Sequence, residues 1–244
     1  MAAQAQHGES AAGKRRRPYA ETLWVTQRDI DGLLLCGEHY GAPYDLLAGA
    51  LRVNRRTLAT LLWRWRQAGH VATGRLGPGP AWCWLTPEGM KAAGLGYSSG
   101  RPALGRLPHI RAVFAARLWL ADGQAWRDGQ AWWRSERRLH VGRPRSATGH
   151  LPDAEVHWPS IEGSPYAGQI WAMEVELSPK PISRTTEIMT ELLSPMRYAT
   201  VVYLTAPAAR SVVLKAVASL QPGERSRIAV RDLPAAAFIA EPTP

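Results

Sequence analysis

The stretch that decides the fold is Arg55-Arg-Thr-Leu-Ala-Thr-Leu-Leu-Trp-Arg-Trp-Arg66. Its apolar residues recur three and four positions apart, which predicts a helix with one buried face. Asn54 is placed to cap the start of this helix, and Gly69 is placed to end it. The buried face comprises Leu58, Leu61, Leu62 and Trp65. We therefore expect the following side chains to lie largely outside: Arg55, Arg56, Thr57, Thr60, Arg64 and Arg66.

The flanking sequence places this basic helix third in a series. Upstream, Thr26-Gln-Arg-Asp29 is a helix start, and residues 44–51 form a short second helix. Downstream, residues 71–85 predict a hairpin with a Gly/Pro-rich tip that carries Arg75. Thr86 and Pro87 then start another helix. The order predicts a winged helix-turn-helix, with a domain that spans residues 19–95.

In such a motif the third helix enters the major groove of DNA. We expect Arg55, Arg56, Thr57 and Thr60 to contact the groove, since these residues lie at the start of that helix. Arg64 and Arg66 are predicted to contact phosphates, and Arg75 to contact DNA from the wing. The alternative is an arginine-rich packing module that serves only protein contacts.

The charge distribution favours a polyanionic partner. The 244-residue chain has a net charge of +10, and residues 1–100 hold 12 Lys and Arg against 7 Asp and Glu. Residues 101–150 hold 10 against 3, whereas residues 151–244 hold 8 against 10. A cationic half beside an acidic half is typical of a protein that holds a phosphate backbone near carboxylates.

Two further observations bound the class of protein. No apolar run approaches the roughly 18 residues that span a bilayer, and the first ten residues lack the apolar core of a signal peptide. We therefore expect a cytoplasmic protein without a membrane partner. Cys36 and Cys83 are the only cysteines, and two thiols do not make the ligand set of a structural zinc site. We expect both to be buried and reduced.

Two segments predict little packed structure of their own. Residues 1–18 are small and polar and end in a basic run, Lys14-Arg15-Arg16-Arg17, so we expect a disordered arm. This arm is either a solvated tail or a DNA contact through Arg15, Arg16 and Arg17. Residues 96–108 have the composition of a linker.

The remainder, residues 109–244, predicts a second domain with the element order α-β-β-β-α-β-α-β. Its helices are expected at 109–121, 183–193 and 208–220. Its strands are expected at 131–139, 153–158, 169–177, 199–205 and 227–231. The whole chain is therefore expected to be a two-domain protein of mixed α+β or α/β class.

Carboxylates on two of these strands are the candidates for chemistry. Side chains alternate between the two faces of a strand. Asp153, Glu155 and His157 therefore share one face of their strand, and Glu174 and Glu176 share one face of the next strand. If the two strands pair, at least two carboxylates converge and repel each other unless a cation lies between them. Oxygen ligands suit Mg²⁺ or Mn²⁺, so Asp153 and Glu174 are predicted metal ligands. Half-buried strands that carry acids without any metal are the alternative.

This arrangement resembles the PD-(D/E)XK nuclease superfamily, whose core is α-β-β-β-α-β. Pro152-Asp153 matches the first acid of the motif, Glu174 matches the second, and Glu136 matches an additional upstream acid. The position of the family lysine holds Glu176, and Lys180 is the nearest substitute. The resemblance implies catalytic roles for Asp153, Glu174, Glu176 and Lys180, or an inactivated nuclease fold that is kept as a scaffold.

The two halves together resemble the replication-relaxation family of actinobacterial mobile elements, in which a winged helix precedes a Pro-Asp…Glu-x-Asp/Glu region. The resemblance implies a double-stranded DNA-binding protein that acts in replication, transfer or regulation of a plasmid, phage or integrative element. The alternatives are a Mg²⁺-dependent endonuclease or nickase and a non-catalytic protein that recruits a replication or transfer partner. The oligomeric state is left open, and a dimer is compatible with the sequence.

The tryptophans are the last feature that bears on nucleic-acid binding. Several could stack on bases, but core packing explains most of them better. These residues are Trp63, Trp65, Trp82, Trp84, Trp132 and Trp133.

Overall fold

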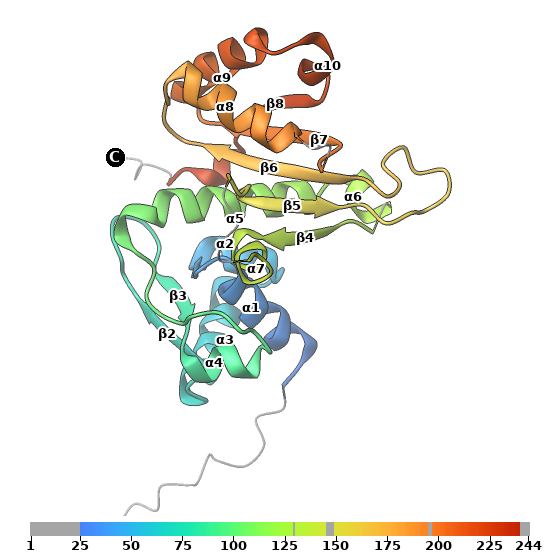
Figure 1. The fold of residues 1–244 in the computed structure, drawn as a ribbon. Coiled ribbons are helices and arrows are strands. Elements are labelled where there is room, and N and C mark those ends of the chain that lie inside the picture. The colour runs from blue at the N-terminus through green and yellow to red at the C-terminus, as the bar shows by residue number, and fades with distance from the viewer. Residues whose placement is uncertain (1–24, 129, 145–148, 195–196, 240–244) are drawn as a thin grey trace, which may run out of the picture.

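The computed structural model describes residues 25–128, 130–144, 149–194 and 197–239 (Figure 1). Across these ranges the chain is a mixed α+β protein with one three-stranded and one five-stranded sheet. This class agrees with the sequence prediction. The expected basic arm at residues 1–18, with Arg15, Arg16 and Arg17, lies outside the described residues.

The N-terminal unit contains four helices and the small sheet. The helices are α1 (Gln27–Glu38), α2 (Tyr44–Ala50), α3 (Arg55–Gln67) and α4 (Pro87–Ala92). The strands are β1 (Ala42–Pro43), β2 (Val71–Gly74) and β3 (Trp82–Leu85), antiparallel in the order β1-β3-β2. Thr26 and Asp29 form a capping box at the start of α1, and Asn54 and Thr86 cap α3 and α4. The predicted helix starts are therefore confirmed.

The segment between the two halves is packed against both of them. The hydroxyl of Tyr97 donates to Glu38 at 2.9 Å, and the guanidinium of Arg137 donates to the backbone carbonyl of Ser98. A short 3₁₀ helix, η1 (Leu104–Arg106), leads directly into α5 (Leu107–Ala121). The stretch expected as a linker thus holds ordered contacts, and α5 begins inside it.

The second half carries the larger sheet. Its other elements are α6 (Gln124–Asp128), β4 (Trp132–Ser135), α7 (Glu136–Val141), β5 (Ala154–His157), β6 (Ile170–Glu176), α8 (Ile182–Leu193), β7 (Thr200–Thr205), α9 (Pro207–Ser219), α10 (Pro222–Arg225), β8 (Ile228–Asp232) and η2 (Ala235–Ala237). The strand order is β4-β5-β6-β7-β8, with the first two pairs antiparallel and the last two parallel. The predicted element order is present, with the short helices α6, α7 and α10 in addition.

One strand is much shorter than the sequence predicts. The pattern of residues 131–139 predicts a single strand, but β4 ends at Ser135 and α7 follows at once. The hydroxyl of Ser135 accepts a hydrogen bond from the backbone N–H of Arg138, so Ser135 is the N-cap of α7. Glu136 therefore starts a helix, where its negative charge is favourable, and does not extend the strand.

Helices cover both faces of the five-stranded sheet (Figure 1). On one face, α5 lies between the sheet and the N-terminal unit, and a single core contains Leu47, Phe114 and Met173. On the other face, α8 and α9 enclose a second core around Met189, Tyr203 and Val213. The two halves are thus joined by a continuous apolar core. None of the described helices is long and apolar enough to cross a membrane.

Candidate functional site

Helix α3 presents two chemically distinct faces. Leu58, Leu61, Leu62 and Trp65 are buried against the N-terminal unit, as the spacing predicts. At the start of the helix, the side chain of Asn54 accepts a hydrogen bond from the backbone N–H of Thr57 at 2.9 Å. This cap fixes where the helix begins, and with it the direction in which the first arginines point.

The outer face of α3 is basic and solvent-exposed. Arg55, Arg56, Thr60 and Arg66 are exposed, and Thr57 is half-buried. Trp63 lies on the same side, one turn after Thr60, and is 53% exposed. Helical spacing had left Trp63 off the buried face that contains Trp65, but the predicted DNA contacts did not include this exposed tryptophan between arginines.

Arg64 differs from the other arginines of this helix. Its guanidinium lies 3.2 Å from the carboxylate of Asp29, which is buried. Arg64 is consequently half-buried and holds α3 against α1, whereas the sequence predicted an outward residue that contacts phosphate. Arg75 is exposed directly after β2, at the start of the hairpin loop, as expected.

The second group of predicted residues lies where β5 and β6 pair. The register places Ala154 opposite Met173, so the preceding residue, Asp153, stands opposite Glu174. Asp153 lies just before β5, and both of its oxygens are engaged. Oδ1 is 2.8 Å from Nε2 of His109 on α5, and Oδ2 accepts from the backbone N–H of Val175 at 2.8 Å.

Glu174 is buried beside this carboxylate. Its Oε1 lies 2.9 Å from Nε2 of His150. The pKa of Glu174 is raised to about 7, chiefly by burial; the charge of Asp153 adds to this rise, whereas His150 and Lys180 oppose it. The two acids that the sequence singled out are therefore neighbours, as predicted.

Glu176 and Lys180, the other two residues to which the nuclease resemblance gives a role, lie beside these acids. Nζ of Lys180 lies 2.5 Å from Oε2 of the buried Glu176. Lys180 lies in the loop between β6 and α8, which begins at Ile182. Lys180 also lies close enough to lower the pKa of Glu174.

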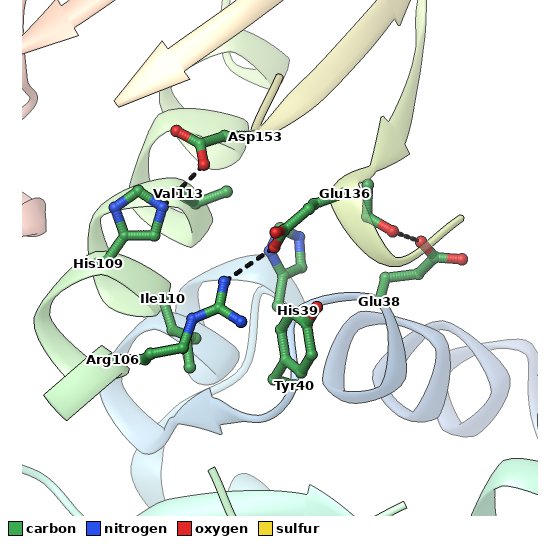
Figure 2. Close-up of a pocket in the computed structure, with 10 residues that line it drawn as sticks. Glu38, His39, Tyr40, Arg106, His109, Ile110, Val113, Glu136 and Asp153 are labelled. Carbon is green, nitrogen blue, oxygen red and sulfur yellow. Dashed lines mark hydrogen bonds and ion pairs between the residues drawn. The ribbon is translucent and has the colours of Figure 1, made fainter. Parts of the chain in front are cut away.

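Glu136 belongs to the rim of a small pocket and not to the pair of acids. This pocket lies between the two halves of the molecule, and Figure 2 shows His109 and Asp153 on one side of it. Across the pocket, the guanidinium of Arg106 donates to Glu136 at 2.9 Å. The resemblance suggested Glu136 as an additional upstream acid, but here an arginine neutralises it.

As arranged, these donors do not fit a divalent cation. Three of the four carboxylate oxygens of Asp153 and Glu174 already face nitrogen donors, from His109, Val175 and His150. Within the described ranges, no group of three or more histidines, cysteines or acids is arranged to hold a metal ion. A cation at this position requires both histidines to turn away first.

Three residues of this site were not predicted from the sequence. His109 and His150 lie 44 and 24 positions from their carboxylate partners, so no local spacing links them. Tyr203 on β7 is paired with Glu174 in register, and its buried hydroxyl has no hydrogen-bond partner in the described structure. Burial raises the pKa of Tyr203, and the neighbouring charges of Glu174, Glu176 and Asp153 raise it further.

Comparison with known proteins assigns no family. No protein-family model and no curated protein matches the sequence. A solved structure described as PigF with SAH aligns with 84% of this chain at 15% identity and a TM-score of 0.19. The alignment spans 62% of the length of that chain, and the likeness is too weak to carry an argument.

Proposed function

We propose that this chain is a double-stranded DNA-binding protein. Its N-terminal half is a winged helix-turn-helix, and its C-terminal half is a PD-(D/E)XK-like domain that contributes no efficient cleavage. The biological role is replication, transfer or regulation of a plasmid, phage or integrative element. The observation that carries the proposal is the exposed basic face of α3.

The division of α3 into two faces matches what groove binding requires. The major groove is about 12 Å wide and admits one helix, whose back must rest on its own domain. Leu58 and Leu62 provide that back, and Arg55 and Arg56 lie in the first turn on the exposed side. An arginine there can form two parallel hydrogen bonds to guanine or contact phosphates.

Neighbouring side chains extend this surface. Thr60 and Trp63 continue it along the helix, and Arg75 lies on the hairpin that follows. An exposed indole offers apolar contact to a thymine methyl group or to a sugar. We include Trp63 among the DNA-contacting residues for this reason.

The experiment is a titration of duplex DNA with fluorescence anisotropy. The duplex is selected first from a random pool by the wild-type protein. We expect Arg55→Ala and Arg56→Ala each to weaken binding by about 1–3 kcal/mol if the arginine makes a bidentate base contact. Arg231→Ala is the matched control, because Arg231 is an exposed arginine on β8, outside the N-terminal unit. Equal affinities for all four proteins at fixed salt would reject α3 as the DNA-binding helix.

Cleavage is excluded from the proposal for two reasons. The acids are engaged by histidines, and Glu176 occupies the place of the lysine that would stabilise the developing negative charge. We expect the protein to bind a supercoiled plasmid in Mg²⁺ or Mn²⁺ without nicking it efficiently. Rapid nicking that Asp153→Asn abolishes would contradict this and would make the protein an endonuclease.

A further inference from the structure

His150 also lines a second pocket, whose charged lining residues are mostly basic. Its space is about 950 Å³, including the part that opens to solvent. Arg134, Arg143 and Arg197 line it together with His150, and Glu191 is the acid in the lining. Neither the sequence prediction nor the proposed DNA contacts of α3 use any of these residues.

A buried carboxylate fixes two of these arginines. Glu155 on β5 is 1% exposed, and its Oε1 accepts hydrogen bonds from Arg197 at 2.6 Å and from the hydroxyl of Tyr198 at 2.7 Å. Its Oε2 lies 3.4 Å from the guanidinium of Arg134 and 2.8 Å from His157. Although burial acts to raise the pKa of Glu155, these donors hold it below its usual value, so the carboxylate stays charged.

The arrangement pre-orients guanidinium groups for an anion. Each guanidinium has five N–H donors in a rigid plane, and Glu155 occupies only part of that set. The side chains of Arg197 and Arg134 remain 49% and 31% exposed where they line the pocket. Guanidinium groups that are already held in place can donate pairs of parallel hydrogen bonds to the oxygens of a phosphate group.

An aromatic side chain lies next to this anion site. Trp132 and Arg134 are two residues apart on β4 and share one face of the strand, about 6.6 Å apart by the usual rise. The indole of Trp132 stacks on His157 at 4.0 Å and is 46% exposed. An exposed aromatic platform beside arginines is the combination that binds unpaired nucleotides.

We propose that this pocket binds a backbone phosphate of a single nucleic-acid strand, with Trp132 stacking on an adjacent base. The inference rests on the proposed function to the extent that the chain acts on DNA. The surface is distinct from α3: α3 binds the duplex, and the pocket binds an unpaired strand. One protein then holds both forms of DNA, as a junction between duplex and single strand would require.

The test measures anisotropy of a fluorescein-labelled decathymidylate with the full chain. We expect Arg197→Gln and Arg134→Gln each to weaken binding about tenfold and to reduce the slope of log affinity against log salt by about 0.7, the value for one phosphate of a single strand. We expect Trp132→Ala to weaken binding about tenfold without changing the salt dependence. Arg184→Gln is the matched control, since Arg184 is a half-exposed arginine on α8 that pairs with Glu187 outside the pocket.

Folding and specificity are controlled separately. Arg197→Lys keeps the charge beside Glu155, so it separates loss of the planar fork from loss of fold, and thermal melting is recorded for every variant. Binding by Arg197→Gln and Arg134→Gln equal to that by Arg184→Gln would overturn the inference. Tighter binding of a phosphoserine peptide than of the strand would also overturn it, because the pocket would then serve a protein partner.

Failure of the proposed function is distinguishable from failure of this inference. The double variant Arg55→Ala/Arg56→Ala should lose the selected duplex and keep the decathymidylate, whereas Arg197→Gln should do the reverse. If the α3 variants keep duplex binding, the proposed function fails while the strand measurement still decides the pocket.

Discussion

Asp29 is a single buried side chain that joins two helices of the N-terminal unit. Its Oδ2 accepts from the backbone N–H of Thr26 at 2.8 Å and lies 3.2 Å from Arg64, and its Oδ1 accepts from the indole of Trp65 at 2.8 Å. Burial acts to raise the pKa of Asp29, but the hydrogen bonds from Thr26 and Trp65 and the charge of Arg64 lower it below its usual value. One carboxylate thus caps α1 and fixes α3 against it.

We predict that Asp29→Ala lowers the free energy of unfolding by about 2–4 kcal/mol. The substitution removes the cap and leaves the indole N–H of Trp65 buried without an acceptor. Urea denaturation measures the change, and Asp31→Ala is the control because Asp31 is an exposed acid on the same helix. A loss no larger than that of the control would show that the contacts of Asp29 contribute little.

At the scale of elements, the approach of α4 to the end of α3 depends on a glycine. A Cβ at Gly89 in α4 would collide with the backbone carbonyl of His70, the residue just before β2. The same carbonyl accepts the backbone N–H of Thr86, which caps α4. Because Gly89 has no side chain, the backbone of α4 can lie directly against the carbonyl of His70.

We predict opposite effects for two glycine substitutions in helices. Gly89→Ala should destabilise the protein by more than about 2 kcal/mol, since backbone must move to admit the methyl group. Gly49→Ala in α2 should stabilise it by about 0.5–1 kcal/mol, because nothing lies within 4 Å of the added Cβ and alanine favours the helix. Thermal and urea unfolding of both variants checks this. Equal effects of the two substitutions would refute the close approach at Gly89.

The elements also show what the sequence could predict. Helix starts at Thr26, Asn54 and Thr86 were predictable because a capping side chain acts on backbone within three residues. The boundary between β4 and α7 was missed because Ser135 stands inside a run whose apolar residues fit a strand. The pairing of Asp153 with Glu174 followed from strand periodicity, whereas their histidine partners come from separate elements that only tertiary packing brings near.

At the scale of the molecule, the two halves meet around a buried histidine. His39 follows α1, and its ring lies 4.7 Å from that of Phe114 on α5 and 6.2 Å from that of Trp133 on β4, measured between centroids. Its Nε2 lies 3.2 Å from the guanidinium of Arg117. Burial lowers the pKa of His39 well below its usual value, and the charge of Arg117 lowers it further. The junction therefore holds a neutral imidazole.

This neutral imidazole makes the union of the two halves sensitive to acid. The unfolded chain binds a proton at His39 below pH 6.5, and the folded chain does not until the pH reaches the lowered value. The contribution of His39 to stability is therefore fully present above pH 6.5 and declines as the pH falls below it. The decline approaches about 1.4 kcal/mol per pH unit, the value for one proton.

We predict that unfolding free energies of the wild type fall more steeply from pH 7 to pH 5 than those of His39→Gln, which cannot take up that proton. His140→Gln, at an exposed position on α7, should follow the wild type. Parallel curves for the wild type and His39→Gln would mean that the imidazole titrates normally and that the junction does not exclude its charge.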